Sequence, residues 1–368
     1  MKAATLTPDQ EQVLAHAQSA PLRMRNLFTR DDWNRYVYEK VPKPELATFT
    51  TYEARLIYNS HLRLVSHPEF DKALLKASLA FRANEFRAEG FLDMVIDGPP
   101  GTGKSFTLRA IGREYQARVS GKEGGRIPVV HITAPIDADG KITWVWEIAC
   151  FLGLNPPPKD EQALLDQRRL PDLTYPVTHV LARSQTRMIL IDDIQRTTPD
   201  QLAPVLHYFD FLRSRYGIAV IFCGTGAAGI VQAARVRADH LTSAEAGLRE
   251  RVAKQRAKAG LPKLPPSREP VPSLLPVTWL DPIHYHGADQ NTWLSVLKGF
   301  EDNLCLRNLS AHCLTNHATD LHRQTGGYFK QLSQLVCQAA VDAMRKDGGE
   351  EDITLERLKC IRVGRDDV

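Results

Sequence analysis

The sequence predicts an α/β fold with a mainly parallel sheet, followed by a smaller domain that is entirely helical. Short β-branched runs alternate with helical periodicity between residues 91 and 280, and a glycine-rich segment joins the first of these runs to a helix. From about residue 289 to 360 only helical spacing remains. Strands separated by helices imply right-handed crossovers and a parallel sheet that is covered on both faces.

The chain divides into four segments by pattern. We expect an N-terminal extension over residues 1–60, packed on the core or on a partner, an α/β domain over 61–285, a helical lid domain over 286–361 and a tail over 362–368. A basic, proline-rich stretch at about 233–272 interrupts the α/β rhythm and predicts an exposed, partly extended insertion. A length of 368 residues suits two domains with an extension.

Composition narrows the class of protein but does not identify a partner. Hydrophobic residues make up 43% and charged residues 24%, as in ordinary globular proteins. No apolar run reaches the roughly 18 residues of a membrane helix, and the polar N-terminus has no signal-peptide core, so we expect a cytoplasmic protein without membrane contact. A net charge of +4 does not by itself argue for nucleic acid. The scattered cysteines, and the histidines near them between residues 305 and 322, match no zinc-site spacing.

The individual elements follow from periodicity and apolar runs. In chain order we expect a helix over Pro68–Glu89, a strand over Phe91–Ile96, a helix over Phe106–Tyr115, a strand over Ile127–Thr133, a helix over Trp144–Leu154, a strand over Met188–Ile191, a helix over Leu202–Tyr216, and strands over Ile218–Cys223 and Leu275–Leu280.

The glycine-rich segment fits the phosphate-binding pattern G-x-x-x-x-G-K-[ST] in full, between a strand and a helix. Its glycines let backbone N–H groups face phosphate oxygens at a helix N-terminus, so it predicts an ATP site. Lys104 would reach the β- and γ-phosphates, and the Ser105 hydroxyl would bind Mg²⁺. The alternative is a glycine-rich turn without a ligand. The predicted nucleotide-binding residues are Gly98, Pro99, Pro100, Gly101, Thr102, Gly103, Lys104, Ser105 and Phe106.

Two carboxylates end the apolar run that begins at Met188. Asp192 would complete the Mg²⁺ site, and Asp193 would orient or deprotonate the attacking water. They could instead cap the following helix. Thr225, after the next strand, is a candidate sensor of the γ-phosphate, or else a turn residue.

This order of motifs resembles that of AAA+ ATPases, and Leu190 to Gln195 is similar to the Walker B strand of DnaA-type initiators. Over residues 50–360 the chain resembles the TniB/TnsC family of transposition ATPases. The stretches that carry this resemblance are Trp144–Leu154, Leu275–Trp279, Trp293–Glu301, Leu304–Leu309, Thr325–Tyr328 and the apolar positions Leu332, Leu335, Ala339 and Ala340.

The resemblance implies a homo-oligomer, as a ring or a helical filament, that assembles with ATP on double-stranded DNA. It would recruit or activate a DDE transposase, with a target-selection protein as a possible further partner, and disassemble on ATP hydrolysis. An arginine of a neighbouring subunit would complete the site, with Arg249 and Arg251 as candidates and Arg237 behind them. Lys330 would be a second sensor or an exposed helix lysine. Asp193 stands where the family more often has Glu, which implies slow hydrolysis.

The same resemblance places DNA contacts in the loops after the first helix and the second strand. These loops hold Lys122, Arg126, Lys141 and Thr143, which would contact phosphates without reading sequence. Isolated basic residues are also common on solvated surfaces. The basic insertion could bind DNA, bind a partner or form a solvated helix.

Two other functions share these motifs. A helicase loader or initiator would share the fold and the DNA but would act on a different partner. A nucleotide-switched signalling or defence ATPase would bind a protein and no DNA.

Overall fold

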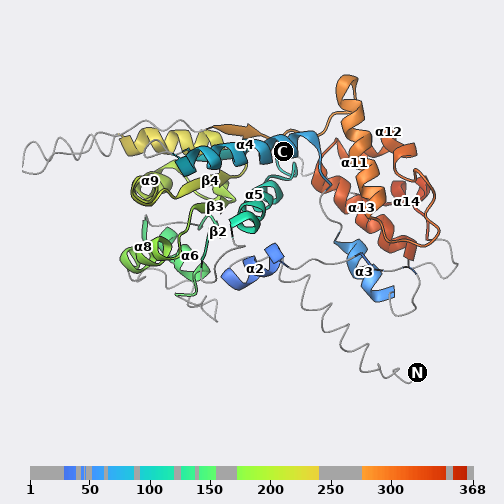
Figure 1. Ribbon diagram of the computed structural model, residues 1–368. Helices are drawn as coiled ribbons and strands as arrows, with labels where there is room; N and C mark the ends of the chain where they lie inside the picture. Colours follow the sequence, from blue (N-terminus) through green and yellow to red (C-terminus); the bar gives the residue numbers. More distant parts are fainter. Residues whose placement is uncertain are drawn as a thin grey trace, which may run out of the picture.

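A computed structural model describes residues 29–38, 43–44, 46, 52–61, 65–86, 92–119, 126–136, 141–154, 172–239, 276–344 and 351–362. Figure 1 shows two bodies side by side, an α/β body and a helical body. Each has its own apolar core. No helix in these ranges is long and apolar enough to cross a membrane.

The α/β body is built on a five-stranded parallel sheet in the order β2-β3-β4-β1-β5, which confirms the predicted fold class. The central strands are buried at every position, as expected of a parallel sheet covered on both faces. The strands are β1 (Met94–Asp97), β2 (Val129–Thr133), β3 (Met188–Asp192), β4 (Ala219–Cys223) and β5 (Val277–Trp279).

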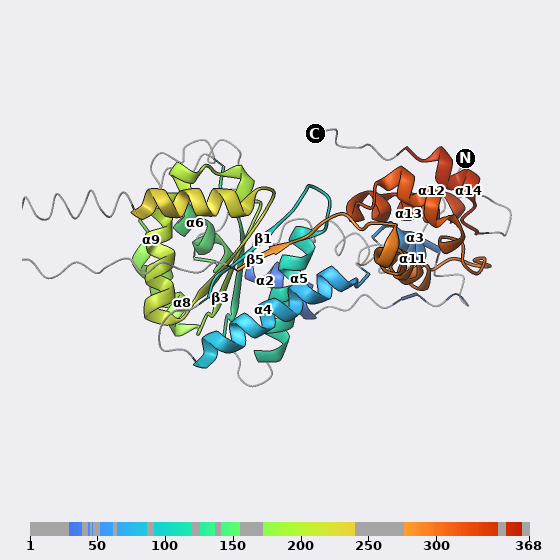
Figure 2. The same ribbon diagram turned by 90° about the horizontal axis from the view of Figure 1, so that it is seen from above.

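Helices cover both faces of this sheet (Figure 2). The long crossover from β1 to β2 puts α5 (Lys104–Val119) on one face, where it packs against α4 (Pro68–Phe86). The connections from β2 to β3 and from β3 to β4 put three helices on the other face, namely α6 (Lys141–Phe151), α8 (Thr174–Arg183) and α9 (Pro199–Tyr216). Because all five strands are parallel, their carboxyl ends meet at one edge of the sheet.

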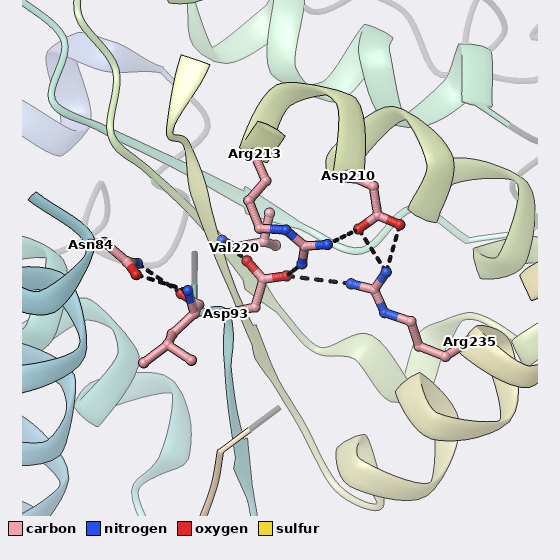
Figure 3. Close-up of polar contacts among 7 residues, drawn as sticks. Asn84, Asp93, Asp210, Arg213, Val220 and Arg235 are labelled. Carbon is pink, nitrogen blue, oxygen red and sulfur yellow. Dashed lines mark hydrogen bonds and ion pairs between the residues drawn. The ribbon is translucent and has the colours of Figure 1, made fainter. Parts of the chain in front are cut away.

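A further helix follows β4 and corrects the predicted insertion boundary. Residues 227–239 are helical, so the first part of the stretch that we expected to be an extended loop from residue 233 continues a regular helix. Arg235 from this helix pairs with Asp210 of α9 and with buried Asp93, where Arg213 joins the same network (Figure 3). The rest of the insertion, from residue 240 to about 272, lies outside the described residues.

The helical body contains α11 (Gln290–Asn303), α12 (Ala318–Thr325), α13 (Phe329–Met344) and α14 (Leu355–Cys360), with short 3₁₀ turns η5 (Gly287–Asp289) and η6 (Thr315–His317). Trp293 and Phe300 are fully buried in its core, as their spacing of seven residues predicts. The core also takes in Val65 and Ile283, so the lid extends beyond the predicted limits of 286–361.

The described part of the N-terminal extension, which we expected to pack on the core or on a partner, is divided between the two bodies. Helix α2 (Arg30–Tyr38) packs on α5, where Trp33 joins the core of the α/β body. Helix α3 (Tyr52–Ser60) packs on α13, and its Arg55 pairs with Glu351 inside the lid. Each attachment buries one large side chain, Trp33 in α2 and Arg55 in α3.

Candidate nucleotide site

The glycine-rich loop lies between the end of β1 and the start of α5, at the edge where the parallel strands end. Gly98, Gly101 and Gly103 have φ angles of 146°, 83° and 92°, which favour glycine strongly. A Cβ atom at Gly98 would lie 2.2 Å from the Leu280 carbonyl oxygen, so this position also lacks space for a side chain. The loop therefore has the backbone freedom that a phosphate cradle requires.

Lys104 is held inside this loop. Its side chain is 8% exposed, and Nζ donates a hydrogen bond to the Pro99 carbonyl oxygen at 2.6 Å. Burial lowers the Lys104 pKa, and the nearby Cys223, Asp97 and Asp192 act in the opposite direction. A buried ammonium with one carbonyl partner is well suited to bind a phosphate oxygen.

Ser105 and Asp192 meet across the gap between α5 and β3. The Ser105 hydroxyl donates to Asp192 Oδ1 at 2.9 Å, and Asp192 is 6% exposed. Burial raises the pKa of Asp192, and the neighbouring Asp193 raises it further. A divalent cation would remove this cost of burying a carboxylate, and both residues supply the hard oxygen ligands that Mg²⁺ prefers. The predicted pair therefore fits a Mg²⁺ ion.

Asp193 adopts a left-handed backbone conformation, with φ of 55°. Its Oδ1 accepts a hydrogen bond from Gln195 Nε2 at 3.0 Å. Gln195 Oε1 accepts in turn from the Thr225 backbone N–H at 3.1 Å. The predicted sensor Thr225 is thus connected to Asp193 through Gln195, a residue that the sequence reasoning did not select. Its position two residues after the aspartate pair was the available signal.

Asp97 is a second residue that the sequence reasoning missed. This buried carboxylate accepts from the backbone N–H groups of Gly98 at 2.6 Å, Gly226 at 2.8 Å and Ala228 at 2.9 Å. It therefore joins the start of the phosphate loop to the loop that follows β4. A carboxylate as the last residue of a buried strand was the sequence signal.

The lid reaches the phosphate loop through the first turn of α13. The Lys330 backbone N–H donates to the Gly101 carbonyl oxygen at 2.9 Å, while the Lys330 side chain is exposed. Gln331 is 7% exposed, and its Oε1 has no hydrogen-bond partner in the described structure. A Cβ atom at Gly101 would lie 2.9 Å from that oxygen. The predicted second sensor lies at the loop, but Gln331 is the side chain that covers it.

The other predicted site residues differ in whether their positions in the structure suit the predicted roles. Phe106 is half-buried, and its ring lies 5.9 Å from that of Phe70. Thr143 is 6% exposed within α6, which corrects its prediction as a surface contact for DNA. Arg126 precedes β2 and so lies at the edge of the sheet opposite the phosphate loop.

Of the remaining candidates for DNA contact and for the arginine of a neighbouring subunit, the structure describes only some. Lys141 is the first residue of α6. Arg237, on the helix after β4, pairs with Asp200 at 2.9 Å. Lys122, Arg249 and Arg251 lie outside the described residues.

Fold and site together define a P-loop nucleotide-binding domain that carries a helical lid. Residues 92–228 match the family described as AAA domain. Two solved structures from Aeropyrum pernix share the fold: the ORC1 protein in complex with DNA, with a TM-score of 0.51 and 15% identity, and the ORC2 protein in its ADP form, with 0.50 and 13%. The alignments cover 81% and 88% of this chain, and 65% and 72% of those proteins. No curated protein matches the sequence significantly.

Proposed function

We propose that this chain is an AAA+ ATPase that oligomerises with ATP on duplex DNA and recruits or activates a DDE transposase, with hydrolysis driving disassembly. The observation that carries the ATPase part is the contact between Ser105 and Asp192 beside the glycine loop. The resemblance to the TniB/TnsC family carries the transposition part.

The residues of the site have distinct roles in this proposal. Bound Mg²⁺-ATP supplies the phosphoryl group to be transferred and the metal charge that stabilises it. Backbone N–H groups of the glycine loop bind the phosphates, and Lys104 exchanges the Pro99 carbonyl for a phosphate oxygen. Ser105 and Asp192 hold the metal, while Asp193 orients the attacking water and accepts its proton. The short Asp193 side chain is expected to make hydrolysis slow.

DNA binding is proposed from one similar structure and from the basic residues of the predicted loops. The similar ORC1 protein was solved in complex with DNA. Lys122 and Lys141 remain the candidate contacts for DNA phosphates in the predicted loops. Arg126 lies at the edge of the sheet opposite the phosphate loop. Arg249 or Arg251 of a neighbouring subunit would complete the nucleotide site in trans.

The test is binding of a fluorescein-labelled duplex of mixed sequence, followed by fluorescence anisotropy at two salt concentrations. We expect tight, salt-sensitive binding with a non-hydrolysable ATP analogue and weak binding with ADP or without nucleotide. A Lys104→Ala variant should bind neither the analogue nor DNA.

Each outcome has a defined meaning. Absence of DNA binding in every nucleotide state would overturn the DNA part and favour a nucleotide-switched signalling protein. DNA binding without stimulation of strand transfer by a DDE transposase would favour an initiator-like ATPase.

A further inference from the structure

The side chain of Gln195 connects the two loops that end β3 and β4. Its Nε2 donates to Asp193 Oδ1 at 3.0 Å, and its Oε1 accepts from the Thr225 N–H at 3.1 Å. Both functional groups of one amide are therefore used, one on the candidate base and one on the candidate sensor loop. Gln195 itself is exposed, so this pair of hydrogen bonds, and not burial, fixes its orientation.

The surrounding backbone is shaped to allow this bridge. A Cβ atom at Gly224 would lie 2.2 Å from Gln195 Oε1, so the amide occupies the space that a larger residue would fill. Asp193 has a left-handed φ of 55°, a conformation that is uncommon for residues other than glycine. Gly224 thus leaves room for the Gln195 amide, and the left-handed Asp193 is a local strain of the kind that gathers at functional sites.

The same loop is also held from the opposite side. Asp97 accepts from the Gly226 and Ala228 N–H groups, so the loop after β4 is joined to the phosphate loop as well as to Asp193. A shift of this loop therefore changes the hydrogen bond that holds the Asp193 carboxylate. The link runs through two hydrogen bonds of one side chain.

We infer that Gln195 is a positioning residue for ATP hydrolysis, which fixes the Asp193 carboxylate relative to the Thr225 loop. This inference rests on the proposed function, because it assigns Asp193 as the residue that orients the attacking water. Within the described part of the chain Gln195 makes no hydrogen bond with Ser105 or Asp192, so its role concerns the Asp193 carboxylate and not the metal ligands. A misplacement of about 1 Å at a reacting group can cost roughly 100-fold in rate.

Two substitutions separate the two halves of the bridge. Gln195→Met keeps the length of the side chain but removes both hydrogen bonds. Gln195→Glu keeps the acceptor for the Thr225 N–H but replaces the donor to Asp193 with a like charge. Gln201→Met is the matched control, because Gln201 lies in the same segment and only caps the start of α9.

Steady-state hydrolysis and hydrogen exchange of the full-length protein provide two independent measurements. We expect both Gln195 variants to lower kcat about 10- to 100-fold with KM for ATP changed by less than about twofold, and Gln201→Met to leave both unchanged. Exchange of the peptide that contains Thr225, measured without nucleotide, should be faster in Gln195→Met and unchanged in Gln195→Glu.

The outcomes distinguish this inference from the proposed function. An unchanged or raised kcat in Gln195→Met, or equal changes of kcat and KM, would overturn the positioning role while leaving the ATPase intact. Unchanged exchange at Thr225 in Gln195→Met would overturn the bridge itself. A wild-type protein that does not hydrolyse ATP, with or without DNA, would instead overturn the proposed function.

Discussion

Glu147 on α6 shows how burial displaces a titratable group that takes no part in the nucleotide site. Burial raises its pKa from 4.5 to about 6, and the Arg196 charge only partly offsets this effect. A carboxyl group whose pKa is raised on folding favours the folded state when it is protonated. The free energy of unfolding therefore falls as the pH rises from 4.5 to about 6, because the buried carboxyl group ionises in this range.

Glu147→Gln is expected to raise the free energy of unfolding by about 1 kcal/mol at pH 8, after a discount for partial solvent screening. The gain should shrink towards pH 4.5 and disappear below it, where the wild-type carboxyl is protonated in both states. Thermal melting at the two pH values measures this, with Glu114→Gln on exposed α5 surface as control. Equal melting temperatures of the variant and the wild type at pH 8 would refute it.

At the scale of elements, the first turn of α13 and the phosphate loop form one unit. Gly101 accepts a hydrogen bond from Lys330 N–H and leaves space for the Gln331 amide. A side chain at Gly101 would be strained by its φ of 83° and would displace that amide. Lid position and loop conformation are therefore coupled through direct contact.

We predict that Gly101→Ala lowers affinity for a fluorescent ATP analogue at least tenfold and lowers the melting temperature. Gly153→Ala is the control, because Gly153 also has positive φ, at 74°, but a Cβ atom there would meet no other atom within 4 Å. The control should be slightly destabilised without losing nucleotide affinity. Equal affinity in the two variants would argue against the contact between lid and loop.

Trp33 is the buried residue through which helix α2 packs on the α/β body, beside contacts made by Asn34 and Tyr36. Trp33 is 1% exposed, lies flat on His131 with ring centroids 5.5 Å apart, and donates from Nε1 to Gln116 at 2.7 Å. Its ring also fills the space beside Gly112. This packing joins the N-terminal segment to the same core as β2 and α5.

Trp33→Ala should destabilise the α/β body by about 3–5 kcal/mol, the usual cost of deleting a buried aromatic side chain. Trp33→Phe, which keeps part of the ring but loses the bond to Gln116, should cost less. Denaturant unfolding followed by circular dichroism measures both. A Trp33→Ala protein as stable as the wild type would show that α2 is not docked in solution.

For the whole molecule, the N-terminal segment attaches to both bodies, and its attachment to the lid depends on charge. Arg55 is fully buried in a two-pronged ion pair with Glu351, which also accepts from the Arg307 N–H at 2.7 Å. Burial alone would raise the Glu351 pKa, but the hydrogen bond from Arg55 and its charge lower it overall. A carboxyl with a lowered pKa stabilises the fold above its unfolded pKa of about 4.3, and this contribution is lost as the pH falls through the folded value.

Glu351→Gln is expected to cost about 3–5 kcal/mol at pH 7, because it leaves the Arg55 charge buried without a counter-charge. The difference from wild type should shrink as the pH falls below about 4. Hydrogen exchange of α3 reports the attachment directly. Glu69→Gln, which breaks the exposed pair with Lys72, is the control and should change little. Unchanged exchange of α3 in Glu351→Gln at pH 7 would contradict the prediction.

The predictable part of the fold consists of elements whose signal is local. The run from Met188 to Asp192 is buried on both faces, and its uninterrupted apolar pattern marks it as a strand. The sequence pattern does not indicate helix α8 (Thr174–Arg183), and it indicates a loop for part of the helix over residues 227–239. In that helix Arg235 is neutralised by Asp93 and Asp210, which lie far away in the sequence, so its charge was misleading.

By itself the sequence determined the parallel α/β core, the helical lid and the glycine loop with Lys104, Ser105 and the two aspartates. These features depend on neighbours along the chain or on one periodic pattern. Only the tertiary structure decided that α2 and α3 belong to different bodies, that Gln331 covers Gly101, and that Gln195 joins Asp193 to Thr225. Those contacts unite residues from different elements, and the geometry that brings them together exists only after the sheet and lid have packed.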